Sequence, residues 1–81
     1  MTKLEEKLIE LGYEQDIQNQ FIYIKFKRMC DIWAYLNEPK NRVDLELHCI
    51  NPLDEQQMKL DILIEEYNEM KKDLEVLKEY E

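Results

Sequence analysis

The sequence has few residues that interrupt regular structure and few that catalyse reactions. Its 81 residues include one Gly, two Pro, one His and no Ser, and its single Thr is Thr2. So few breakers leave little room for loops. A serine nucleophile is excluded, and a cysteine nucleophile would need His48 as its base. His48 and Cys49 are neighbours on an expected strand and point to opposite faces, so we expect no enzyme and no cofactor.

Basic residues are also scarce, with 11 against 19 acidic residues and a net charge of −8. Such a surface repels phosphate backbones, which argues against direct nucleic-acid binding. No run approaches the ~20 apolar residues of a membrane span, and the first 12 residues are too charged for a signal peptide. We therefore expect one cytoplasmic domain, formed by residues 1–81, without a membrane partner.

Only two cysteines are present, Cys30 and Cys49. Both fall at inward positions of an alternating apolar pattern, where cysteine behaves as a small hydrophobic residue. In a cytoplasmic protein they are expected to be reduced core thiols. A disulfide and a ligand role are the less favoured alternatives, and no metal-ligand spacing is recognisable.

Regular structure is expected at both ends of the chain. Thr2 and Glu5 have the spacing of a capping box, which begins a helix over residues 3–12 that Gly12 ends. Asn51 and Pro52 are suited to the cap and first position of a long helix over residues 52–80. That helix would span about 43 Å against about 26 Å for an eight-residue strand, so it would overhang its own sheet, bend or find a partner.

Between the helices, residues 20–50 alternate with a period of two and predict three strands joined by short connectors. Residues 13–20 are weakly patterned and indicate a loop or a frayed strand start. The fold class is therefore α+β, in the order helix, three-stranded antiparallel meander, long helix. The expected core consists of Leu4, Leu8, Leu11, Ile22, Ile24, Phe26, Ile32, Ala34, Val43, Leu45, Leu47 and Cys49.

The long helix carries a 3,4 spacing of apolar residues that is typical of a coiled coil. The seam of a homodimer would contain Leu63, Tyr67, Met70, Leu74 and Leu77, preceded by Leu60. In a parallel dimer, Glu66 and Asp73 would face Lys71 and Lys78 of a second copy. Packing of the same helix on its own sheet is the alternative.

Two surfaces are candidates for binding a partner. One is a sheet face that carries Phe21, Tyr23, Trp33 and Tyr35 beside Asp44, Glu46 and His48. Aromatic rings on a rigid sheet are favoured anchors at protein interfaces, although they could also be half-buried by a helix. His48 itself is expected to be a residue at the solvent edge of its strand.

The second surface is the acidic helix, where residues 52–81 carry ten acidic and four basic side chains. Its candidate binding residues are Asp61, Glu65, Glu66, Glu69 and Asp73. Such a helix could imitate the charge of a nucleic-acid backbone towards a nucleic-acid enzyme, or could simply be a solvated face.

The segments from Leu4 through Gly12 to Tyr13 and from Asp73 to Lys78 resemble small phage and prophage proteins of Gram-positive bacteria. The resemblance implies a protein that binds a host protein, and the anti-CRISPR members of this group block a CRISPR nuclease. It carries over no site residue. We therefore expect an acidic, non-enzymatic inhibitor of a host protein in the host cytoplasm. The alternative is a self-associating structural or assembly component of a phage particle or replication complex.

Overall fold

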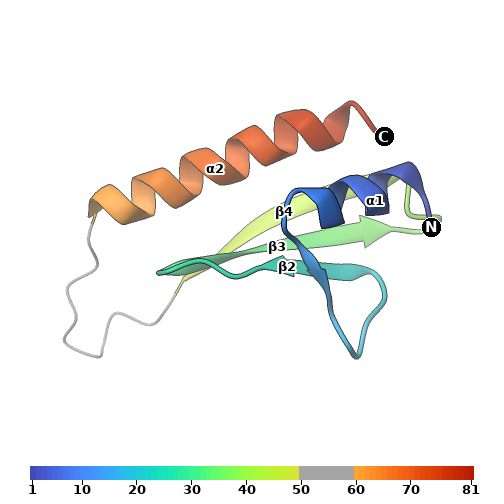
Figure 1. Cartoon of the computed structure of the whole chain (residues 1–81), viewed down its shortest axis with the longest axis horizontal. Helices are drawn as coiled ribbons and strands as arrows, with labels where there is room; N and C mark the ends of the chain where they lie inside the picture. The colour runs from blue at the N-terminus through green and yellow to red at the C-terminus, as the bar shows by residue number, and fades with distance from the viewer. Residues whose placement is uncertain (50–59) are drawn as a thin grey trace.

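The computed structural model describes residues 1–49 and 60–81 as two helices and four strands (Figure 1). The expected α+β class and antiparallel meander are confirmed. In chain order the elements are α1 (Lys3–Glu10), β1 (Glu14–Gln15), β2 (Ile22–Lys25), β3 (Cys30–Asn37), β4 (Arg42–Cys49) and α2 (Leu60–Lys78).

The first helix begins with the capping box that the sequence predicts. The Thr2 hydroxyl accepts a hydrogen bond from the Glu5 amide at 3.2 Å, and the Glu5 carboxylate accepts one from the Thr2 amide at 2.9 Å. Gly12 follows the helix with φ +102°, a left-handed conformation that glycine adopts without steric cost. This turn directs Tyr13 back onto the helix, where its amide donates to the Leu8 carbonyl.

The sheet has four strands rather than three, in the order β1-β2-β3-β4, with every neighbouring pair antiparallel. The additional strand, β1, consists of Glu14 and Gln15, which pair with Ile24 and Tyr23. It lies in the segment where the sequence indicates a loop or a frayed strand start. A strand of two residues is too short to leave an alternating pattern, so the sequence could not distinguish a loop from the start of a strand.

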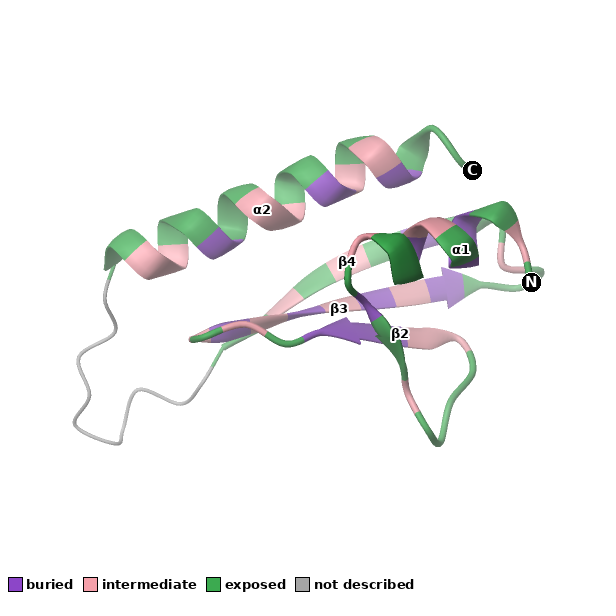
Figure 2. Ribbon diagram, in the orientation of Figure 1, coloured by how far each residue is buried: buried purple, intermediate pink, exposed green. Residues whose placement is uncertain are grey.

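Both helices contribute to the core on a single face of the sheet, which makes a two-layer structure (Figures 1 and 2). The buried cluster joins both helices to alternate residues of β2, β3 and β4. Its members are Leu4, Leu8, Tyr13, Tyr23, Ile32, Ala34, Leu36, Val43 and Leu77, with Leu11, Phe21, Leu45, Leu47 and Met70 packed against them. The second face of the sheet is covered by neither helix.

The facing of β2 is opposite to the expected one. Tyr23 pairs with Ala34 and is 1% exposed in the core, and Phe21 packs against the same cluster. The expected core residue Phe26 is instead 63% exposed.

The face with Ile22, Ile24 and Phe26 is the more apolar one, because the other face carries Lys25 beside Phe21 and Tyr23. Lys25 can nevertheless face the helices, because Asp73 and Glu69 on α2 pair with its charge. A shift of one residue exchanges the two faces, and the β2–β3 register determines which face is buried.

Of the helix expected over residues 52–80, the described residues contain α2 from Leu60 to Lys78, and residues 52–59 lie outside the described part of the chain. The positions of Asn51 and Pro52 lie outside the described residues. The 19 residues of α2 span about 28 Å, close to the length of an eight-residue strand. The described part of the helix is therefore about as long as one strand of the sheet.

A disulfide joins Cys30 and Cys49, so the expectation of reduced thiols is wrong. The β3–β4 register places the two residues directly opposite each other at the end of the sheet. Cys30 is buried as expected, whereas the expected core residue Cys49 is exposed. The alternating pattern put both on one face but did not reveal that they are register partners.

Replacing both cysteines by alanine is expected to lower the free energy of unfolding by about 3 kcal/mol. The bond closes a loop between residues 19 positions apart, and the entropy that it removes from the unfolded chain corresponds to this value. Urea unfolding followed by circular dichroism would measure it, with the wild-type chain under reducing conditions as a second determination. Equal unfolding midpoints of oxidised and reduced protein would contradict the prediction.

Glu5 also connects the first helix to the sheet, because its carboxylate is buried among donors. Burial by itself raises the pKa of Glu5. The Thr2 amide and the Lys40 and Tyr23 side chains outweigh this effect by stabilising the carboxylate, so its pKa falls to about 2. Burial, together with this carboxylate, raises the pKa of Tyr23 to about 12, which keeps that hydroxyl protonated as a donor.

This pKa predicts how stability depends on acid. The unfolded chain protonates Glu5 near its usual 4.5, whereas the folded chain does so near 2. The contribution of Glu5 is therefore complete above pH 4.5 and is lost as the pH falls from 4.5 towards 2. Thermal unfolding followed from pH 7 to pH 2 should show this loss, and Glu5→Gln should lower the melting temperature at pH 7 and make the acid slope shallower. A slope that Glu5→Gln leaves unchanged would refute this assignment.

Candidate functional site

The candidate interaction site is the sheet face opposite the helices, which we call the open face. Its central residues lie on β3 and β4, where Trp33 is paired with Glu46, Tyr35 with Asp44 and Asp31 with His48. Trp33 and Tyr35 are half-buried, whereas Glu46 and Asp44 are exposed. Each aromatic ring on β3 therefore lies beside a carboxylate or an imidazole on β4.

The rings of the open face form one connected cluster. The Trp33 and His48 rings are stacked, with centroids 4.3 Å apart and an interplanar angle of 7°. His48 Nε2 lies 2.7 Å from a Glu46 carboxylate oxygen and 3.2 Å from the Tyr35 hydroxyl. Burial, reinforced by the Glu46 carboxylate, raises the pKa of Tyr35. These contacts hold the rings in fixed positions, as an interface anchor requires.

The sequence identified half of this surface correctly. Trp33 and Tyr35 lie on the open face as expected, and Ile22 and Ile24 take the places on β2 that were assigned to Phe21 and Tyr23. Ile24 is buried there, as expected of a core residue, whereas Ile22 is only half-buried. The expectation for Phe21 and Tyr23 is wrong, because both side chains pack in the core. His48, expected to be a strand residue at the solvent edge, is stacked on Trp33 within the cluster.

On the helix side of the sheet, a buried ionic network joins α2 to β2. The Lys25 ammonium lies 2.6 Å from the Asp73 carboxylate and 2.9 Å from that of Glu69. The Tyr13 hydroxyl donates to Asp73 at 2.9 Å, and burial together with this carboxylate raises the pKa of Tyr13. Burial also raises the pKa of Glu69, but Lys27 and Lys25 outweigh it and the net pKa is lowered. These charges satisfy one another inside the protein.

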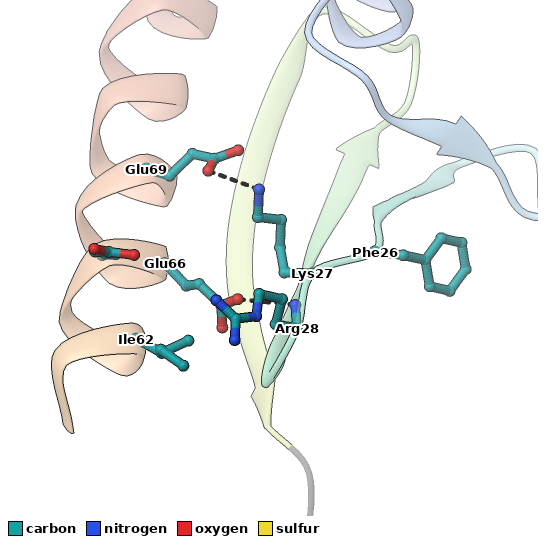
Figure 3. Close-up of a pocket in the computed structure, with 7 residues that line it drawn as sticks. Phe26, Lys27, Arg28, Ile62, Glu66 and Glu69 are labelled. Atoms are coloured by element: carbon teal, nitrogen blue, oxygen red, sulfur yellow. Dashed lines mark hydrogen bonds and ion pairs between the residues drawn. The ribbon is translucent and has the colours of Figure 1, made fainter. Parts of the chain in front are cut away.

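Glu66 makes a second set of contacts between α2 and the sheet. Its carboxylate accepts hydrogen bonds from the amides of Arg28, Met29 and Cys30, the shortest at 2.8 Å. Beside it is a pocket of about 280 Å³ between α2 and the β2–β3 turn (Figure 3). The polar contacts that Figure 3 shows there join Glu66 to the turn and Glu69 to Lys27. The side chains that line this pocket therefore make the polar contacts that attach α2 to the β2–β3 turn.

Of the acidic residues expected to bind a partner, some are buried against the sheet and others are exposed to solvent. Glu66 is 4% exposed and Asp73 is 6% exposed, so neither is available to a partner. Asp61 and Glu65 are exposed, and Glu69 is half-buried between two lysines. Acidic side chains can face the sheet when the fold supplies a cation or amide donors to them, and the sequence does not show those donors.

The residues of the expected dimer seam are likewise divided. Leu77 is 0% exposed in the protein's own core, and Met70 packs against that core. Leu63 and Leu74 are half-buried, and Tyr67 is exposed. Glu66 and Asp73 make their contacts within the protein, so they are not free to pair with Lys71 and Lys78 of a second copy in a parallel dimer.

Across residues 1–49 and 60–81 there is no group of three metal-ligating side chains, and no helix of those ranges could cross a membrane. Comparisons with protein families, with curated proteins and with solved structures gave no match for this chain. The candidate site therefore rests on the geometry of the open face alone.

Proposed function

We propose that this chain is a small, non-enzymatic interaction protein that binds another protein through the open face and inhibits it. The observation that carries the proposal is the arrangement of the two layers. Both helices pack on one face of the sheet, and neither covers the connected rings of Trp33, Tyr35 and His48 on the other. Rigid aromatic side chains on an exposed surface are the commonest anchors of protein interfaces.

The charge of the surface supports a partner with a basic binding region. The net charge is −8, and five lysines are engaged in ion pairs within the protein: Lys7, Lys25, Lys27, Lys40 and Lys78. Complementary charge accelerates association and selects partners. We extend the proposal to a host nucleic-acid enzyme such as a defence nuclease, because such enzymes present basic channels and because the chain ends resemble small phage proteins.

A pull-down from a bacterial lysate at physiological salt would test the proposal, with the purified chain as bait. Trp33→Ala should lose the recovered partner, whereas the matched control Tyr67→Ala, an exposed aromatic residue on α2, should retain it. The recovered protein would then be assayed with and without the chain. A partner recovered equally by both variants would reject the open face, and unchanged partner activity would reject inhibition.

Self-association is the second candidate function, and one observation favours it. Leu60, Ile64 and Tyr67 form an exposed apolar stripe on α2, with exposed fractions of 64%, 50% and 47%. Burying such side chains between two copies would be favourable. Sedimentation equilibrium would decide between the candidates, because this alternative requires a mass above 10 kDa that Ile64→Glu returns to the monomer value.

A further inference from the structure

We infer that the open face binds an extended segment of a protein partner in which arginine or lysine alternates with other residues. The inference rests on the proposed function and names the chemistry of the partner. It is carried by the juxtaposition, across the β3–β4 register, of each aromatic ring with a carboxylate: Trp33 with Glu46 and Tyr35 with Asp44.

Each of these pairs offers a basic side chain two complementary contacts. Directly opposed residues have Cβ atoms about 5 Å apart, so a group placed over the ring is also within reach of the carboxylate. One face of the Trp33 ring is stacked on His48, so a cation at this pair would use the part of the ring that His48 leaves open. Aromatic faces attract cations, and a guanidinium both stacks on a ring and donates two hydrogen bonds to a carboxylate. The combination selects arginine above lysine and selects either above a neutral side chain.

The spacing of the pairs fits an extended segment. Asp44 and Glu46 are separated by two positions on one strand, which places their side chains about 7 Å apart on the same face. Alternate side chains of an extended partner segment have the same spacing. Two basic residues separated by one other residue could therefore occupy the Tyr35–Asp44 and Trp33–Glu46 pairs together. The side chains of two adjacent basic residues would point to opposite sides of the segment.

The charge of the whole face has the matching sign. The strands place four acidic residues on it, Glu14, Asp31, Asp44 and Glu46, and a single arginine or lysine, Arg42. Asp31 accepts a hydrogen bond from the Lys27 amide at 2.9 Å, which commits it to the β2–β3 turn. Asp44 and Glu46 are exposed and lie beside the rings. The His48 and Tyr35 contacts of Glu46 both go to its Oε1 atom, so Asp44 and the second oxygen of Glu46 are the acceptors available to an incoming cation.

The fluorescence of Trp33 can report binding directly, because it is the only tryptophan in the chain. The purified, oxidised chain would be titrated at low salt with a peptide of alternating arginine and threonine. The comparison peptide has the same composition with its arginines in one block. We expect the alternating peptide to change the Trp33 emission and to bind more tightly. Equal affinities, or binding without a change in emission, would overturn the inference.

A matched pair of variants separates this site from general charge attraction. Asp44→Asn/Glu46→Gln should weaken binding of the alternating peptide by about five- to tenfold, as expected for two exposed charge contacts. Glu75→Gln/Glu79→Gln removes the same charge from exposed positions of the last helix and its end, and should change affinity less than twofold. Circular dichroism confirms that each variant is folded. Equal weakening by both double variants would overturn the inference.

The same variants in the lysate pull-down distinguish the two proposals. Loss of the partner with Trp33→Ala and with Asp44→Asn/Glu46→Gln supports both. Loss with Trp33→Ala alone keeps the open face as an interaction surface and overturns its recognition of basic side chains. Retention with every variant overturns both proposals.

Discussion

Replacing Lys25 with methionine is expected to lower the free energy of unfolding by about 4 kcal/mol. Lys25 is the cation between the carboxylates of Asp73 and Glu69, and its side chain is 10% exposed. Methionine keeps most of the volume but leaves the Asp73 carboxylate buried without an opposite charge. Urea unfolding at pH 7, followed by circular dichroism, would measure the change.

Two further variants isolate the ionic origin of this effect. Lys72→Met removes an exposed lysine of α2 and should alter stability by no more than about 0.5 kcal/mol. Lys25→Met/Asp73→Asn removes the stranded charge and keeps an acceptor for the Tyr13 hydroxyl, so it should recover part of the loss. A double variant that is as unstable as the sum of the two single variants would show that the network is not coupled.

Replacing Glu66 with alanine is expected to cost a similar amount, about 4 kcal/mol. Its carboxylate is the acceptor for three consecutive amides at the end of the β2–β3 turn and the start of β3. The Cys30 contact is buried and the other two are part-buried, and a buried amide left without an acceptor costs about 1–3 kcal/mol. Hydrogen exchange gives a local measurement in addition to urea unfolding. The amides of residues 28–30 should exchange faster in Glu66→Ala than in the wild type.

Glu65→Ala is the matched control, because Glu65 is the neighbouring exposed carboxylate on the same helix. It should leave both the stability and the exchange of residues 28–30 near wild-type values. If Glu65→Ala and Glu66→Ala had equal effects, helix charge rather than the amide contacts would be responsible, and the structural role of Glu66 would be refuted.

These two expected results concern acidic residues that the sequence assigned to partner binding. A carboxylate on a helix is a solvated group unless the fold supplies a cation or amide donors to it. Lys25 and the Arg28–Cys30 amides are such donors, and they are 48 and 36–38 positions away from their acidic partners in the chain. No local pattern around Glu66 or Asp73 contains that information.

The sequence by itself determined the features that depend on neighbouring residues. The capping box at Thr2, the left-handed Gly12 and the alternation in β3 and β4 identified one helix and two strands, because each is set by local backbone chemistry or by periodicity. The same alternation put Trp33 and Tyr35 on one face. Half of the candidate site was therefore predictable.

Only the tertiary structure decided the features that depend on register and on distant partners. The β2–β3 register buried Tyr23 and exposed Phe26, although the face with Phe26 is the more apolar of the two. The β3–β4 register placed Cys30 opposite Cys49 and gave each ring of the open face its carboxylate. Periodicity shows which residues share a face, but strand pairing alone determines which of them meet.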